Sequence, residues 1–239
     1  AYQKKQAAKG EKVIKFFHTV LSGWVLGGVF VVGISCWFLL KKRNREFALA
    51  SIKIGAIFGL VASLLAVWTG DGSGYQIAQT QPMKLAAVEG LYEGGTNVGL
   101  VGIGMLNPEK KTYNDGKDPF LFRIEIPSML SFLAERDVDG YVPGITNIIE
   151  GGYQLKDGTT ALSAAEKIER GKTAIGALAA YRAAKSAGHE EDAAVAYQVL
   201  QENMPYFGYG YIKDVNQLVP NVPLNFYAFR IMVILGGYF

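Results

Sequence analysis

Residues 13–40 read VIKFFHTVLSGWVLGGVFVVGISCWFLL, and this stretch decides the fold. Its only basic side chains are Lys15 and His18, and it contains no acidic residue. A helix needs roughly 20 apolar residues to cross the hydrocarbon core of a bilayer, and this run is longer. Residues 13–40 are therefore predicted to form a transmembrane helix.

Two further apolar runs follow in the sequence. Residues 47–69 contain a single charged residue, Lys53, so they also predict a transmembrane helix. The short basic turn of residues 41–46 joins the first two runs into a hairpin. The third run, residues 224–239, contains Arg230 and reaches only roughly 16 residues, which predicts the start of another transmembrane helix. We expect the chain to be an internal piece of a longer polytopic membrane protein.

The hairpin fixes which segments share one side of the membrane. A chain that crosses twice returns to the side on which it began. The polar lead-in of residues 1–12, the long loop of residues 70–223 and the start of the third run are therefore expected on one face. The formal net charge of +3 is too small to indicate nucleic acid. Lysine and arginine gather at the ends of the apolar runs, which makes lipid head groups the expected counterpart.

The long loop is predicted to be mostly helical. Residues from about 160 to 205 are rich in Ala, Glu and Lys with apolar residues at helical spacing, and Gly188 is expected to divide them into a helical pair. Residues 120–126 favour a short extended segment, and residues 128–136 a short helix. The glycines of residues 99–104 lack the spacing and context of a dinucleotide-binding loop. The predicted fold class is an all-α membrane protein.

His18 is the first candidate functional residue. It lies roughly a turn and a half inside the first span, where an ionisable side chain is costly and needs a partner. A packed, hydrogen-bonded histidine and a metal ligand both explain it. Gly23 and Gly27 follow, and these small residues could leave room for a flat cofactor or let another helix approach closely.

Met232 and Arg230 are the candidates in the third run. Met232 is expected at a similar depth to His18 and on the same side, and histidine with methionine is an axial pair of electron-transfer haems. A methionine in an apolar span is, taken alone, core packing. Arg230 could reach the interface or pair with a buried anion such as a haem propionate.

Lys84 and Glu89 are the candidates in the loop. They stand in a short Ala-rich segment that is expected to be helical, where a spacing of five residues separates them by roughly 140°. Lys84 could donate a hydrogen bond to a substrate oxygen while Glu89 accepts a proton. The alternative is a pair of solvated charges.

Several motifs, in order along the chain, resemble subunit I of cytochrome bd quinol oxidases. They are Lys15-Phe16-Phe17-His18-Thr19-Val20 with Ser22-Gly23, Gly33-Ile34-Ser35, Gly70-Asp71 with Ser73-Gly74-Tyr75, Lys84-Leu85-Ala86-Ala87 with Glu89, and Pro223-Leu224 with Phe229-Arg230-Ile231-Met232-Val233. The resemblance is looser between residues 90 and 222.

The resemblance implies roles for the candidate residues. It makes His18 and Met232 the axial ligands of a low-spin b-type haem, with Arg230 close to that haem. It makes Lys84 and Glu89 the quinol-binding residues of the loop, which in this family is called the Q-loop, with its quinol-binding part at residues 70–93. The complete subunit would also hold a high-spin b-type haem and a haem d, where oxygen is reduced to water.

The resemblance further implies location and partners. The Q-loop would lie on the extracytoplasmic side of a bacterial cytoplasmic (inner) membrane, with the turn of residues 41–46 in the cytoplasm and quinol protons released outside. The expected partners are quinol, oxidase subunit II, small accessory subunits and membrane lipid. The residues do not decide between ubiquinol and menaquinol.

Two other hypotheses explain the same residues differently. A membrane-anchored extracytoplasmic sensor or binding module would use the loop to recognise a ligand without redox chemistry, and it would hold no haem. An assembly subunit would use the intramembrane histidine and arginine for helix contacts alone.

Overall fold

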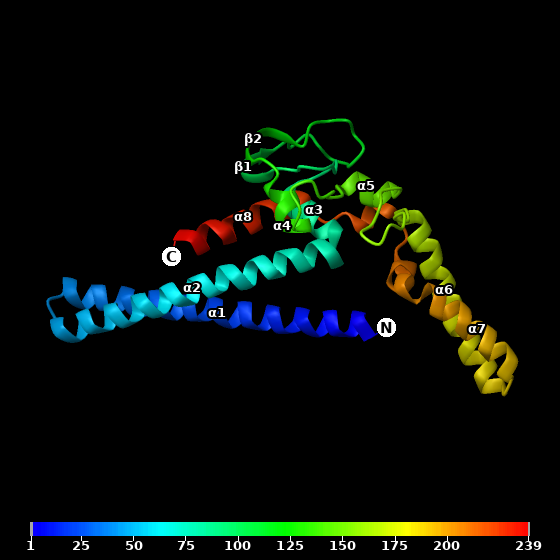
Figure 1. The fold of residues 1–239 in the computed structure, drawn as a ribbon, viewed down its shortest axis with the longest axis horizontal. Helices are drawn as coiled ribbons and strands as arrows, with labels where there is room; N and C mark the ends of the chain where they lie inside the picture. Colours follow the sequence, from blue (N-terminus) through cyan, green and yellow to red (C-terminus); the bar gives the residue numbers. More distant parts are fainter. Residues whose placement is uncertain (1, 239) are drawn as a thin grey trace. The chain divides into compact units, whose positions relative to one another are not determined.

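The computed structural model describes the backbone of residues 2–238 and the side chains of residues 12–238 (Figure 1). The chain divides into two compact units. The membrane unit comprises Ala1–Gln81, Phe132–Asp137 and Tyr227–Phe239, and the loop unit comprises Pro82–Ser131 and Val138–Phe226. The helices α4 (Met129–Glu135) and α8 (Val222–Tyr238) each begin in the loop unit and end in the membrane unit.

Two long helices, α1 (Tyr2–Leu40) and α2 (Arg45–Thr80), form the predicted hairpin. Both are long and apolar enough to cross a membrane, as is the segment Val215–Tyr238 that contains α8. The turn between them uses left-handed backbone at Lys42 (φ 53°) and Asn44 (φ 40°), which reverses the chain within four residues, 41–44. These helices confirm the predicted class, an all-α membrane protein, with one small sheet in the loop unit.

Buried residues at a seven-residue repeat, all but one of them small, bring α1 and α2 together. The buried positions are Leu21, Gly28 and Ser35 on α1 and Ala48, Gly55 and Ala62 on α2. A seven-residue period keeps one seam of each helix facing its partner. A Cβ atom on Gly28 would lie 2.8 Å from the Cα atom of Gly59, so the two backbones are in contact there. An added Cβ on Gly23 or Gly27 would meet nothing within 4 Å, so the close approach within the hairpin does not use that pair.

The close contact at Gly28 predicts an asymmetry between neighbouring glycines of α1. Gly28→Ala forces the helices apart and is expected to destabilise the complete protein by about 1–3 kcal/mol, the usual cost of overpacking. Gly27→Ala is the matched control, because the space beside Gly27 is open among the described residues. Thermal unfolding of the purified protein in detergent measures both, and an equal loss of stability in the two variants would contradict this packing.

α2 extends further than the apolar run predicts. The sequence places residues 70–80 in the loop, but they continue α2 as three more turns up to Thr80. The apolar run ends at residue 69, but the helix continues because backbone hydrogen bonds form between polar residues as well as between apolar ones. Glycine costs about 1 kcal/mol in a helix interior, and contacts to α4 described below offset that cost. The position at which α2 leaves the membrane stays a prediction.

The loop unit contains a two-stranded sheet, short helices and a longer helical pair, α6 and α7, that extends away from the sheet (Figure 1). The strands β1 (Leu100–Leu106) and β2 (Phe120–Ile126) pair in antiparallel fashion. The helices are α3 (Pro82–Glu89), α5 (Ile145–Glu150), α6 (Ala164–Ala187) and α7 (Glu190–Asn203), followed by the 3-10 segments η1 (Met204–Tyr211) and η2 (Val215–Leu218). The extended segment expected at residues 120–126 and the helix expected at residues 128–136 are confirmed as β2 and α4.

The predicted helical pair is also confirmed, and its ends have clear causes. Ser163 caps α6 by accepting a hydrogen bond from the backbone N–H of Glu166, whose carboxylate accepts one from the Ser163 backbone. Gly188 ends α6 with a left-handed φ of 75°, which a residue without a Cβ adopts freely.

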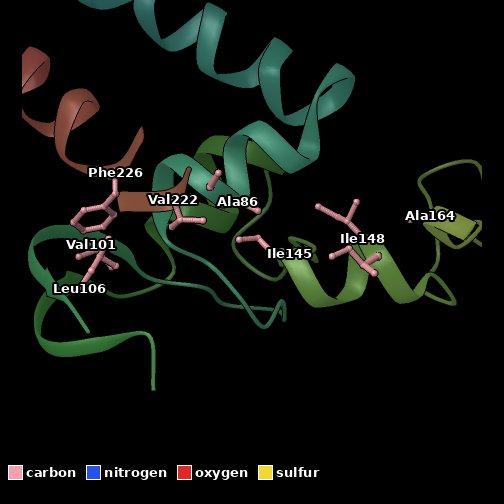
Figure 2. Packing of buried hydrophobic residues seen from close by; sticks show 10 residues of the cluster. Ala86, Val101, Leu106, Ile145, Ile148, Ala164, Val222 and Phe226 are labelled. Atoms are coloured by element: carbon pink, nitrogen blue, oxygen red, sulfur yellow. The ribbon is translucent and has the colours of Figure 1, made fainter. Parts of the chain in front are cut away.

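The core of the loop unit includes the first turns of α8. Figure 2 shows Phe226 and Val222 of α8 among side chains from α3, β1 and α5. Phe226 is fully buried, and its ring lies 5.5 Å from that of Phe120 of β2. The buried cluster consists of Ala86, Ala87, Val101, Leu106, Ile145, Ile148, Ile149, Ala164, Val222 and Phe226. The N-terminal end of a candidate membrane helix is thus fixed inside the loop unit.

Candidate functional site

His18 hydrogen-bonds to α2 within the membrane unit. Its Nδ1 atom lies 3.1 Å from the carbonyl oxygen of Ala66 and 3.2 Å from the hydroxyl oxygen of Thr69. A carbonyl oxygen only accepts hydrogen bonds, so Nδ1 must carry the proton. The Thr69 hydroxyl donates to carbonyl oxygens of its own helix, 3.0 Å away at Leu65 and 3.1 Å away at Ala66, and therefore accepts from His18.

These contacts are compatible with metal binding by the imidazole. With the proton on Nδ1, the neutral ring keeps its lone pair on Nε2, and a metal-bound histidine commonly donates its other N–H to a backbone carbonyl. Gly70 provides the space, because a Cβ there would lie 3.2 Å from Cε1 of His18. The two explanations of His18 are thus compatible: the ring is packed and hydrogen-bonded through one nitrogen, and the other nitrogen can bind a metal.

Arg230 and Met232 lie on the part of α8 that belongs to the membrane unit, which also contains His18. The Met232 side chain is 55% exposed, so its thioether can still be approached. Arg230 is half-buried. Two residues along a helix turn by roughly 200°, so the two side chains project from different faces of α8.

Lys84 and Glu89 occupy different environments on α3. Lys84 is exposed, whereas Glu89 is only 4% exposed at the C-terminal end of the helix. The alternative of two solvated charges is therefore wrong for Glu89. Burying a carboxylate is costly unless it is hydrogen-bonded or paired, which makes such a position a candidate for function.

Glu89 borders a cavity of about 700 Å³ inside the loop unit. Its wall is mixed in character: it includes the charged residues Lys110, Arg123 and Glu125 as well as the ring of Phe120. Lys84 is absent from the lining residues that the structure describes. A cavity of this size can hold a small molecule, and the many charged and polar residues in its wall favour a polar ligand group or water beside Glu89.

Thr146 of α5 is a further polar group at this cavity. Its hydroxyl oxygen is buried, and among the described residues it has no hydrogen-bond partner. Buried hydroxyls nearly always have a partner, so an orphaned one marks a place where water or a ligand group is expected. Sequence reasoning missed Thr146, because a single threonine in a polar loop carries no signal.

An ion pair fixes the wall of the cavity. The Lys110 ammonium lies 2.8 Å from the Asp115 carboxylate and 4.5 Å from the centre of the Tyr92 ring. Lys110, together with the backbone N–H groups of Thr112, Lys117 and Lys111, holds the pKa of Asp115 well below its ordinary value. A lowered pKa contributes stability that is present above the ordinary value and is lost as the pH falls below it. The wall therefore keeps this ion pair throughout the neutral range.

The polar end of α2 binds the end of α4 within the membrane unit. Asp71, Tyr75 and Gln79 are spaced four residues apart and so lie on one face of α2. Asp71 makes two hydrogen bonds to the Arg136 guanidinium, at 3.1 and 2.5 Å, and this contact raises the pKa of Arg136. The guanidinium also lies 5.0 Å from the centre of the Tyr75 ring, and Gln79 donates to the Ala134 carbonyl.

This anchor predicts a measurable coupling between Asp71 and Arg136. Asp71→Asn and Arg136→Gln should each destabilise the protein modestly, and the double variant should show a coupling free energy of about 0.5–1 kcal/mol, because the pair is partly exposed. The control is the exposed pair Glu169 and Lys172 of α6, for which a coupling near zero is expected. Equal coupling in both pairs, measured by chemical denaturation, would refute the anchor.

The fold and these sites define a helical membrane protein with a histidine that is hydrogen-bonded through Nδ1 and a loop unit with a buried carboxylate at a cavity. Residues 7–239 match the family of cytochrome bd terminal oxidase subunit I, and the chain belongs to that family. The family membership confirms the resemblance that the motifs indicate.

Individual relatives agree with the family. The chain is 33% identical to cytochrome bd-II ubiquinol oxidase subunit 1 of Escherichia coli, over 94% of this chain and 42% of that protein. It is 30% identical to cytochrome bd ubiquinol oxidase subunit 1 of Bacillus subtilis, over 56% of this chain and 28% of that protein. The bd oxidase structure from Geobacillus thermodenitrificans shares the fold, with a TM-score of 0.50 and 21% identity over 94% of this chain and 46% of that one. The chain thus spans less than half the length of these relatives.

Proposed function

We propose that this chain is the quinol-oxidising part of a cytochrome bd-type terminal oxidase in a bacterial inner membrane. The observation that carries the proposal is the hydrogen bond from Nδ1 of His18 to the Ala66 carbonyl, which leaves Nε2 able to bind iron. His18 and Met232 would hold a low-spin b-type haem, and Arg230 would lie near it. Such a haem accepts one electron at a time and has no site for oxygen.

Lys84 and Glu89 would act on the substrate in different ways. Lys84, which is exposed, would donate a hydrogen bond to a quinol oxygen and so orient the ring. Glu89 would accept a proton, because quinol loses two protons and two electrons on becoming quinone. The cavity beside Glu89, with the Thr146 hydroxyl in its wall, would provide a polar route for the proton toward the extracytoplasmic side.

The complete oxidase would use the electrons elsewhere. The complete subunit would also hold a high-spin b-type haem and a haem d, which would supply the chemistry of oxygen reduction: two quinol molecules would provide the four electrons that, with four protons, convert one oxygen molecule into two water molecules. Subunit II and small accessory subunits would complete the assembly. Related proteins are named for ubiquinol and for menaquinol, so both are candidate substrates.

Haem content separates this proposal from the sensor hypothesis. Purified complete protein should give a pyridine haemochrome spectrum of b-type haem and should oxidise a soluble quinol in the presence of oxygen. A sensor or binding module predicts no haem. A protein that is pure and folded but free of haem would overturn the proposal.

Lys84→Met should weaken quinol binding more than turnover. Loss of one charged hydrogen bond costs about 1.5–3 kcal/mol, which corresponds to a KM about tenfold to a hundredfold higher. Steady-state quinol oxidation measures KM and kcat separately. Lys213→Met is the control, because Lys213 is also an exposed lysine of the loop unit. An unchanged KM in Lys84→Met would remove Lys84 from the site.

A further inference from the structure

The β1–β2 hairpin has two faces of different character. Its inner face meets the core and the cavity through Phe120, Arg123 and Glu125. Its outer face carries five large apolar side chains that are 50–63% exposed. They are Ile103 and Met105 of β1 and Phe122, Ile124 and Ile126 of β2.

The strand register makes the outer face continuous. Met105 pairs with Phe122, and Ile103 pairs with Ile124, so these side chains cover one another across the two strands. Antiparallel sheets that face water normally alternate apolar and polar residues, with the polar set outside. Here Arg123 and Glu125 of β2 line the open cavity, with side chains 49% and 38% exposed, and the apolar set lies on the opposite face. Exposed apolar patches of this kind mark a surface that meets protein or membrane.

The packing of the hairpin against α8 indicates whether its outer face meets protein or membrane. Phe120 of β2 packs against Phe226, which is the fifth residue of α8 and fully buried in the loop unit. α8 belongs to a candidate membrane span, Val215–Tyr238. The hairpin is therefore packed against the first turns of a helix that is apolar enough to enter a membrane, which favours lipid as the partner of its outer face.

We propose that the outer face of the β1–β2 hairpin inserts into the lipid interface of the membrane. Phe122, Ile124, Ile103 and Met105 would then exchange water for acyl chains and glycerol, as the apolar side of an interfacial amphipathic segment does. This proposal does not depend on quinol chemistry. Its functional consequence rests on the proposed function: the strand that touches lipid also forms the wall of the cavity beside Glu89, where a lipid-soluble substrate would arrive.

Quenching of a fluorescent label tests this placement in the complete protein. Phe122→Cys is labelled with a nitrobenzoxadiazole dye in a background whose native cysteines, including Cys36, are replaced. Ile103→Cys provides a second position in case the first variant folds poorly. Glu191→Cys, at an exposed position of α7 in the same unit, is the matched control. The labelled proteins are reconstituted in phosphatidylcholine nanodiscs, with or without doxyl-labelled phosphatidylcholine.

Doxyl lipid should quench the dye at positions 122 and 103 and leave the dye at position 191 bright, whereas aqueous iodide should do the reverse. Quenching of positions 122 and 103 by iodide would overturn the proposal in favour of a water-exposed face. Protection from both quenchers would also overturn it and would indicate a covering protein. The measurement needs no turnover, so a failure of quinol oxidation would leave its outcome unaffected.

Discussion

Replacing His18 with Ala is expected to remove the low-spin b-type signal from the reduced-minus-oxidised spectrum of the complete protein. The physical reason is the loss of Nε2 of His18. This is the ring nitrogen that remains available for a metal when Nδ1 is hydrogen-bonded to Ala66 and Thr69. An alanine leaves a gap beside Gly70 and supplies no ligand atom. We expect the loss of this signal to be complete, and quinol oxidation to fall with it.

His189→Ala is the matched control, because His189 is the other of the two histidines in the sequence. His189 stands at the start of α7, with its side chain 66% exposed and 3.6 Å from the Asp192 carboxylate. Its spectrum should be unchanged. An unchanged low-spin signal in His18→Ala would refute the assignment of His18 as a ligand, whatever the activity of that variant.

Replacing Glu89 with Gln should lower the turnover of quinol by about 10²–10⁴-fold, the usual contribution of a positioned proton acceptor. Glutamine matches glutamate in size and keeps its ability to form hydrogen bonds, but it does not take up a proton. The KM should change little, because the group that binds the quinol oxygen in this scheme is Lys84. Stopped-flow reduction of the haems by quinol measures the step directly.

Two outcomes decide the meaning of the Glu89 variant. Glu191→Gln on α7 provides the control, since Glu191 is an exposed glutamate of the same unit and should leave turnover unchanged. Retained quinol oxidation in Glu89→Gln would favour the assembly-subunit hypothesis, in which the intramembrane histidine and arginine serve helix contacts. Loss of turnover with intact haem spectra would support proton acceptance at Glu89.

The membrane hairpin and the helical pair could be predicted from sequence because their signals are local. Apolar runs define α1 and α2, and Ser163 and Gly188 mark the ends of α6 through capping contacts within a few residues. The extension of α2 could not be predicted in this way. It depends on Asp71 meeting Arg136, a contact between residues 65 positions apart in the sequence.

The strand β1 shows the same limit. The glycines Gly102 and Gly104 make residues 100–106 look like a loop in the sequence. This segment becomes a strand because it pairs with β2. At the candidate site, the sequence predicted that His18 needs a partner, but it could not name Ala66 or Thr69, which lie about fifty residues away. The cavity and Thr146 arise from tertiary packing alone.

The burial of Phe226 in the loop unit has a thermodynamic consequence for the proposed haem. Phe226 and Met232 belong to one continuous helix, α8, and lie roughly 9 Å apart along its axis. If Met232 binds iron, then binding stabilises the orientation of α8, and by linkage it stabilises the core in which Phe226 is packed. Folding of the loop unit and retention of the haem would then form a single equilibrium. Chemical denaturation of the loop unit could therefore be followed in the absorption spectrum of the haem.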